Sequence, residues 1–371
     1  MVEHQHLTPA LDRSVSLRRQ VTSQAMHVFA GWGYREIQVP ILDYFDSLKE
    51  GLDERQIARS FRFVDRTGNL MVLQPDITPA VAKVYAYQLQ GTPLPLRLSY
   101  ANNVVRIERS LTGEQLESNQ LGIELIGARG LVADVEVLLI ALEVLEELGL
   151  EHYQINVADH RTAKLLLNAT GAPGRIREEV RRAIIARDPD AVREILTGLG
   201  AREMYVEAVA VLAELVDGTE QLEAIRSLMS THVKVLERLD YLKALERSIE
   251  DLGYGEHVRL DLGELGGASY YTGLGFNVVA EGVGRELGRG GRYDDLVGRF
   301  GADTPAVGFS FSLETIVEFL HSSSPSSGRR FDGGDAIYVD PSDPIKGLHV
   351  ALERRRRDKP TRIVSRPESS R

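Results

Sequence analysis

The chain has 371 residues, enough for two or three domains, and its 43% hydrophobic and 26% charged residues are typical of a folded globular protein. A formal net charge of −10 argues against a surface built to wrap nucleic acid, which needs clustered lysine and arginine. The absence of cysteine excludes disulfides and thiolate metal sites. The first residues are polar, and the most apolar run, 131–150, carries five acidic residues, so we expect a cytoplasmic protein.

The first ninety residues contain a helix, a strand and a strand–turn–helix unit. Apolar residues at helical spacing predict an amphipathic helix over 9–31, which "GWG" ends. "YREIQVPIL" at 34–42 alternates and predicts a strand. Pro40 lacks an N–H group, which places that strand at a sheet edge, a bulge or an interface. "NLMVLQPDITPAVAKVYAY" at 69–87 predicts a strand, a turn and a helix.

The middle of the chain changes from strands to helices and back. Two apolar runs on either side of a polar loop predict a hairpin over 96–127, and a helix that is apolar nearly all round follows at 131–148. Residues 160–250 have helical spacing throughout. Strand patterns return from residue 257, interrupted by the glycine- and arginine-rich run "GRGGRYDD" at 288–295, which is typical of a loop that handles phosphate.

Hairpin strands with grouped helices predict an α+β fold with an antiparallel sheet rather than a doubly wound sheet. We expect a core formed by 1–159 and 251–321, with a helical insertion at 160–250. A Ser- and Pro-rich linker at 322–332 leads to a short C-terminal β-α-β fragment at 333–371.

Several familiar motifs are incomplete. "GLGFNVV" carries Val278 where a dinucleotide fingerprint needs its third glycine, and the run at 288–295 lacks the Lys-Ser/Thr of a phosphate-binding loop. His4 and His6 lie in a polar tail without a carboxylate partner, so no metal site is expected. The arginines at 354–357 suit a nucleic-acid patch or the C-terminus of a helix, and the second interpretation is favoured.

Four segments together resemble the catalytic core of histidyl-tRNA synthetase, a class II aminoacyl-tRNA synthetase, over residues 8–320. The helix and strand ending at Pro40 resemble motif 1, which forms the dimer interface in that class. "VVRIERSLTGEQLESNQLGIELIG" resembles motif 2, and "GASYYTGLGF" resembles the histidine signature RGLDYYTG. "GGRYDDLVGRFGADTPAVGFSFSLETI" resembles motif 3. The resemblance implies an antiparallel sheet flanked by helices, and self-association through the motif 1 region.

The resemblance also implies a histidine-binding pocket. A free amino acid presents an ammonium, a carboxylate and a side chain, and each needs a complementary partner once it is desolvated. A carboxylate with tyrosines suits a neutral imidazole, which offers one donor and one acceptor. The implied residues are Asp76, Thr78 and Gln120 for the ammonium, Arg106 for the carboxylate, and Glu124, Tyr270 and Tyr271 for the ring.

Synthetases of this family use arginine side chains to activate histidine with ATP, and two of these arginines are missing from this sequence. The motif 3 arginine after the Leu-Glu pair is Thr315, and the arginine and aspartate of the histidine signature are Gly266 and Ser269. Neither glycine nor threonine replaces a guanidinium, and loss of one such group costs about 10²–10³ in rate. Ser118 and Asn119 replace the Phe-His of motif 2, which weakens the expected stacking of adenine.

A histidine pocket without these cations resembles the histidyl-tRNA-synthetase-like regulatory subunits of ATP phosphoribosyltransferase. Synthetases of the family carry a full anticodon-binding domain after motif 3, whereas 56 residues follow Thr315, so we expect a truncated module. The resemblance implies a non-catalytic protein without a cofactor. Its implied partner is the short-form catalytic subunit, which performs the first step of histidine biosynthesis under feedback inhibition by histidine.

Two alternatives remain open on the sequence. A divergent histidyl-tRNA synthetase that activates histidine with ATP is favoured by Arg106, Glu108 and "GGRYD", and opposed by Gly266 and Thr315. A synthetase-like module that senses tRNA needs a basic surface, and the acidic balance speaks against tRNA as a partner.

Overall fold

The computed structural model describes residues 13–110, 113–323, 335–339, 350, 353–354, 356–357 and 361–365. The chain divides into two compact units, 1–323 and 324–371, and each is described by itself. His4, His6 and most of the predicted linker lie outside the described residues.

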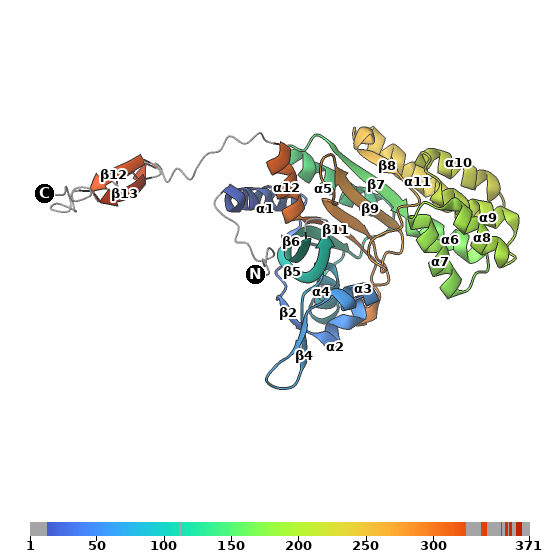
Figure 1. Ribbon diagram of the computed structural model, residues 1–371, viewed down its shortest axis with the longest axis horizontal. Helices are drawn as coiled ribbons and strands as arrows, with labels where there is room; N and C mark the ends of the chain where they lie inside the picture. Colours follow the sequence, from blue (N-terminus) through green and yellow to red (C-terminus); the bar gives the residue numbers. More distant parts are fainter. Residues whose placement is uncertain are drawn as a thin grey trace. The chain divides into compact units, whose positions relative to one another are not determined.

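The first unit is built on an eight-stranded sheet (Figure 1). In order across the sheet the strands are β1 (Arg35–Glu36), β5 (Leu96–Ser110), β6 (Gly113–Ile126), β11 (Ala306–Ser312), β10 (Gly288–Arg292), β9 (Leu274–Ala280), β7 (Tyr153–Asp159) and β8 (Val258–Leu260). Neighbouring strands are antiparallel except for the outer pairs β1–β5 and β7–β8, which are parallel. The α+β class and the predicted hairpin over 96–127 are confirmed.

Alternation along the long hairpin gives the sheet two different faces. Leu121, Ile123 and Leu125 of β6 point into the larger core, which three helices cover. These helices are α1 (Arg13–Gly31), α5 (Leu131–Glu147) and α12 (Leu313–Ser323). Gln120 and Glu124 alternate with these three apolar residues, so they lie on the opposite face of the sheet.

The opposite face carries the smaller core and short helical elements. These are α4 (Ile77–Val84), a π-helical turn η3 (Tyr85–Leu89) and a 3-10 turn η6 (Val297–Phe300). Tyr100 of β5 is fully buried in this core, and its register partner in β6 is Gly122. Beyond it lie a three-stranded sheet and two short helices, namely β2 (Leu42–Tyr44), β4 (Leu70–Leu73), β3 (Arg62–Val64), α2 (Phe45–Leu48) and α3 (Glu54–Arg59).

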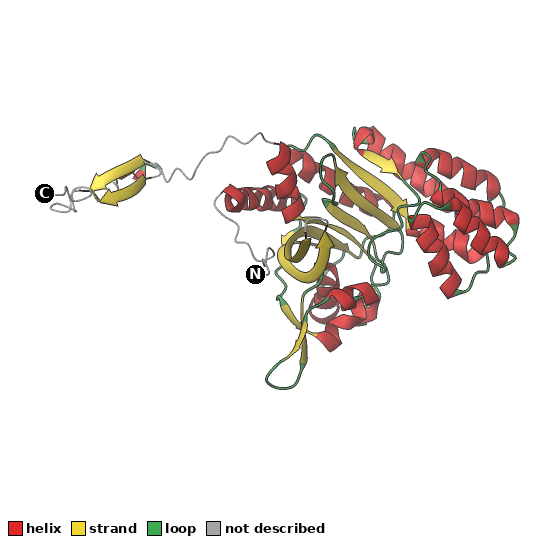
Figure 2. Cartoon of the chain, viewed as in Figure 1, coloured by secondary structure: helices red, strands yellow, loops and turns green. Residues whose placement is uncertain are grey.

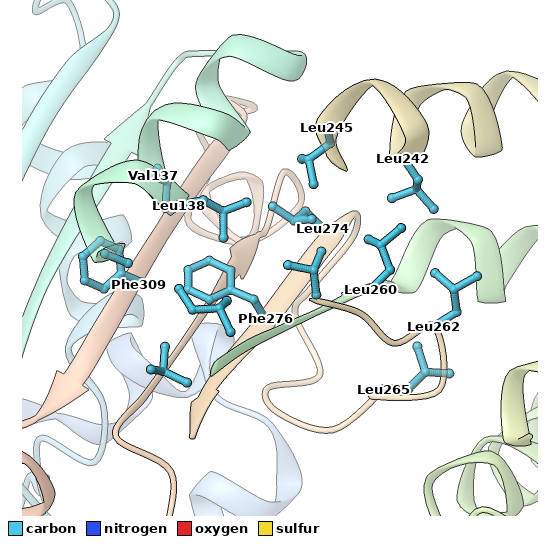
Figure 3. Packing of buried hydrophobic residues seen from close by; sticks show 14 of the residues in the cluster. Val137, Leu138, Leu242, Leu245, Leu260, Leu262, Leu265, Leu274, Phe276 and Phe309 are labelled. Atoms are coloured by element: carbon cyan, nitrogen blue, oxygen red, sulfur yellow. The ribbon is translucent and has the colours of Figure 1, made fainter. Parts of the chain in front are cut away.

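Helices fill the chain between β7 and β8. They are α6 (His160–Ala169), α7 (Gly174–Ile185), α8 (Pro189–Gly198), α9 (Glu203–Ala210), α10 (Gly218–Leu228) and α11 (Val233–Asp251). Leu242 and Leu245 of α11 face Leu260 and Leu274 at the sheet, so the helical segment and the sheet share one apolar core (Figure 3).

Two sequence expectations were wrong. The strand predicted over 34–42 is broken: β1 ends at Glu36, and β2 begins only at Leu42, with Pro40 between them. The run at 288–295, expected as a loop, begins with the central strand β10. Its glycines serve packing rather than flexibility, because a Cβ at Gly290 would lie 2.4 Å from the ring of Phe276.

The second unit contains β12 (Asp335–Val339) and β13 (Thr361–Ser365), which pair in parallel (Figure 2). Residues 350, 353–354 and 356, between the two strands, are helical. In the part of the chain that the structure describes, no helix has the length and apolar character to cross a membrane.

Candidate functional site

A cavity of about 760 Å³ opens on the face of the sheet that carries Gln120. Six of the seven residues expected for a histidine pocket line it: Asp76, Thr78, Arg106, Gln120, Tyr270 and Tyr271. Thr315 also lines it, whereas Gly266 lies one residue before the lining segment that begins at Gly267. The fold therefore gathers into one cavity residues that are up to 195 positions apart in the sequence.

Asp76 stands at the N-terminus of α4, and three side chains donate to its carboxylate. They are Gln56 Nε2 at 2.9 Å, Gln120 Nε2 at 3.2 Å and the Tyr270 hydroxyl at 3.0 Å. Gln120 is fixed at its other end, because its Oε1 accepts from the backbone N–H of Ile77 at 3.0 Å. Asp76 is 8% exposed and makes no ion pair with a described residue. A carboxylate in this setting favours a cationic group of a ligand.

Glu124 lies directly behind the cavity wall and is fully buried. Its carboxyl accepts hydrogen bonds from the hydroxyls of Thr78 at 2.7 Å, Tyr100 at 3.1 Å and Tyr293. Burial raises the pKa of Glu124 to about 8, although the three hydroxyl donors act in the opposite direction. Thr78 and Tyr293 line the cavity, so they connect this buried carboxyl to its interior.

Neutral aromatic rings form one wall. Tyr270 and Tyr271 meet edge to face with ring centroids 5.3 Å apart, and Tyr293 meets Tyr270 at 5.8 Å. Burial raises the pKa of Tyr270 well above its usual value, so its hydroxyl stays protonated. The ring centroid of His160 lies 5.5 Å from that of Tyr271, and burial lowers the pKa of His160 to about 4. This wall suits an uncharged planar ring.

Arg106 approaches the cavity from β5, where an irregularity in strand register separates Val105 from Glu108. Its Nη1 donates to the carbonyl oxygen of Pro75 at 2.9 Å, so the guanidinium is held beside the turn that carries Asp76. The cavity thus has an anion and a cation at neighbouring points, as an amino-acid zwitterion requires.

Position 315 is occupied by a nearly buried threonine. Thr315 is 3% exposed, and its hydroxyl bonds to Ser312 Oγ at 2.9 Å in the first turn of α12. Neither Thr315 nor Gly266 itself has a cationic side chain that could meet a transferring phosphate.

Sequence reasoning missed three residues that hydrogen-bond to Asp76 or Glu124, namely Gln56, Tyr100 and Tyr293. Tyr100 could have been predicted, because the hairpin register and the alternation of side chains place it on the same face of the sheet as Glu124. Gln56 forms a capping box with Asp53. That pattern predicts the start of α3, but it does not predict the hydrogen bond from Gln56 to Asp76. Among the described residues, no group of three or more His, Asp or Glu could hold a metal ion.

Comparison with known proteins points to one family. A sequence model of the histidyl-tRNA synthetase family matches residues 6–316. The ATP phosphoribosyltransferase regulatory subunit of Geobacter metallireducens is 35% identical over 81% of this chain and 69% of its own. That of Syntrophotalea carbinolica is 34% identical over 89% of this chain and 77% of its own.

Solved structures give the same result. One described as an ATP phosphoribosyltransferase regulatory subunit/histidyl-tRNA synthetase from Bacillus halodurans C has a TM-score of 0.85 and 26% identity, covering 100% of this chain and 94% of that chain. Histidyl-tRNA synthetase from Nostoc sp. PCC 7120 has a TM-score of 0.76 and 17% identity, which shows a shared fold. The chain therefore belongs to the family of ATP phosphoribosyltransferase regulatory subunits, which carry the fold of histidyl-tRNA synthetase.

Proposed function

We propose that this protein is the cytoplasmic regulatory subunit of a short-form ATP phosphoribosyltransferase and that its cavity binds free histidine. The observation that carries the histidine assignment is the nearly buried carboxylate of Asp76, which lacks a cationic partner among the described residues and lies beside Gln120 and Tyr270. An amino acid's ammonium supplies the missing charge. Membership of the regulatory-subunit family supports the rest of the assignment.

The remaining contacts follow from the same geometry. Arg106 stands where a carboxylate next to that ammonium would lie. Tyr271 and Tyr270 form the wall for the imidazole. Glu124, reached through Thr78, supplies a carboxyl for a ring N–H.

Regulation requires that histidine distinguish two states of the complex. A ligand shifts an equilibrium only by its difference in affinity for the two states, and a tenfold change in inhibition needs about 1.4 kcal/mol of coupling. Histidine that binds to this subunit would then lower the activity of the catalytic subunit as the concentration of histidine rises.

Self-association through the motif 1 region is part of the proposal. Strands β2, β3 and β4, which follow the motif 1 region in the chain, expose a set of large apolar side chains that a partner surface would cover. This set consists of Leu42, Tyr44, Phe63, Val64 and Leu70.

The decisive experiment is co-purification with a short-form ATP phosphoribosyltransferase catalytic subunit, assayed with and without histidine. We expect a stable hetero-oligomer whose activity falls when histidine is added. Failure to associate would remove the regulatory assignment for this pair. Calorimetry with histidine, on the free chain and on the complex, tests the pocket separately.

The competing function is histidine activation with ATP. Histidine-dependent exchange between ATP and pyrophosphate distinguishes it, and we expect none, since Gly266 and Thr315 supply no cation. Binding of uncharged tRNA in a gel shift at physiological salt would instead support a tRNA-sensing module.

A further inference from the structure

Arg289 of β10 places a guanidinium against the backbone of the histidine-signature segment. A Cβ built at Gly266 would lie 3.1 Å from Arg289 Nη1, and one at Gly267 would lie 2.9 Å from the same nitrogen. The Arg289 side chain therefore occupies the space that a side chain at 266 would enter. Arg289 also lines the cavity.

Two carboxylates fix the orientation of this guanidinium. Glu286 accepts from both Nε and Nη2 of Arg289, and Glu264 Oε1 lies 3.6 Å from Nη2. Nη1 has no hydrogen-bond acceptor among the described residues. The guanidinium fork is thus held rigidly by one edge, and its remaining nitrogen stays available to a ligand.

Arg289 Nη1 lies on the ring side of the cavity. The hypothetical Cβ at Gly267 that is 2.9 Å from Nη1 is also 3.0 Å from the Tyr271 ring, so the nitrogen and the ring flank the same glycine. Gly267 has a φ of +92°, which itself favours glycine, whereas the φ of Gly266 is not positive. A side chain at 266 would therefore meet the flexible ends of the Arg289 and Glu264 side chains, whereas the backbone conformation at 266 would accept it.

We propose that Arg289 replaces, from a different strand, the guanidinium that the histidine signature lacks at position 266, and that its Nη1 binds the carboxylate of the amino acid in the cavity. The inference rests on the proposed histidine pocket and names a further specificity-determining residue in it. Arg106 is the other arginine assigned to this carboxylate, and both arginines line the same cavity. Because Glu286 and Glu264 offset its charge, Arg289 acts as a directed donor rather than as a source of net attraction.

The test compares two ligands, histidine and histidinol, which has a hydroxymethyl group in place of the carboxylate. We expect Arg289→Gln to weaken histidine binding by about 10- to 100-fold, the range of a lost hydrogen bond to a charged group. Histidinol binding should change by less than about threefold. Calorimetry with the full chain, alone and in complex with the catalytic subunit, measures both affinities.

Arg193 offers a matched control outside the cavity. Its side chain is 33% exposed, compared with 32% for Arg289, and it is also held by carboxylates, namely those of Asp190, Glu207 and Glu214. Arg193→Gln should leave both affinities unchanged. A relocation variant gives the sharpest outcome: Gly266→Arg combined with Arg289→Gln should regain histidine binding relative to Arg289→Gln alone.

Each remaining outcome decides the matter. Equal losses for histidine and histidinol in Arg289→Gln, or no loss for either, would overturn the role of Arg289. Weaker binding of AMP with unchanged binding of histidine would assign the guanidinium to a phosphate and also overturn it. If the unmodified protein and its complex both fail to bind histidine, the proposed pocket fails and the role of Arg289 in it fails with it.

Discussion

Arg292 of β10 and Asp134 of α5 form a buried ion pair across the larger core. Asp134 Oδ1 accepts from Nε of Arg292 at 2.8 Å and from Nη2 at 2.5 Å, and the two side chains are 8% and 1% exposed. Arg292 also donates to the carbonyl oxygen of Ala128 at 3.0 Å. The arginine of "GGRYD" is absent from the cavity lining and joins the sheet to its covering helix.

Breaking this pair should destabilise the fold strongly. We expect Arg292→Met to lower the free energy of unfolding by about 3–5 kcal/mol, because it leaves the Asp134 carboxylate buried without its partner. Urea unfolding measures the change. Lys243→Met, which removes an exposed partner of Glu223, should cost less than about 1 kcal/mol and serves as the control.

Asp76→Asn should weaken histidine binding by about 10- to 100-fold, because it removes the charge opposite the ammonium and keeps the shape. Imidazolepropionate, which has no ammonium, should bind both proteins equally. Calorimetry provides the comparison, and an unchanged affinity for histidine would show that Asp76 does not read the ammonium.

Tyr271 should contribute mainly as an aromatic wall. Its ring packs against Tyr270 and His160, so Tyr271→Ala should weaken histidine binding by about tenfold or more. Tyr271→Phe keeps the ring and should weaken binding by only about threefold to tenfold. If the two variants bind histidine equally, the ring does not form the wall.

Glu124→Ala should also weaken histidine binding, since it removes the carboxyl that lies behind Thr78.

Glu124 should make stability fall as pH rises. Its pKa is about 8 in the folded chain and 4.5 in the unfolded chain, so between these values the folded state holds a proton that the unfolded state has lost. Unfolding free energy should therefore decrease from pH 5 to pH 8, by up to a few kcal/mol at about 1.4 kcal/mol per unit. Urea unfolding of Glu124→Gln should lack this component. Parallel pH curves for the two proteins would rule it out.

Gly290→Ala should destabilise the sheet by about 1–3 kcal/mol, because its Cβ would lie 2.4 Å from Phe276 and 2.5 Å from Phe309. Gly198 in α8 provides the same substitution in open space, since nothing lies within 4 Å of its added Cβ. Gly198→Ala should be neutral or stabilising by about 0.4–1 kcal/mol. Thermal or urea unfolding of both variants tests the contrast.

The sequence predicted elements wherever periodicity was long. The hairpin over 96–127 and the helix after residue 131 were recovered because many alternating or apolar positions agreed. β10 was missed because three of its five residues are glycine, a composition that local patterns assign to loops. Its strand state depends on Phe276 and Phe309 in neighbouring strands, which composition cannot show.

The candidate site was predictable only as far as family motifs reached. Asp76 and Gln120 could be named from their motifs, and the structure brings them within 3.2 Å of each other. The bond from Gln56 to Asp76 spans 20 positions and depends on how α3 meets α4. The position of Arg289 beside Gly266 likewise arises from the meeting of β10 with a distant loop, which no local pattern encodes.

The parallel pairing of β7 with β8 gives the helices α6–α11 a structural role as the connection between these two strands. Val157 aligns with Leu260 and Ile155 with Val258, so the chain must travel back along the length of β7 before it enters β8. Two parallel neighbours need a crossover connection of about a dozen residues or more. The helical segment is that crossover, so a chain shortened there must keep enough backbone to span the strand, and a tight turn cannot replace it.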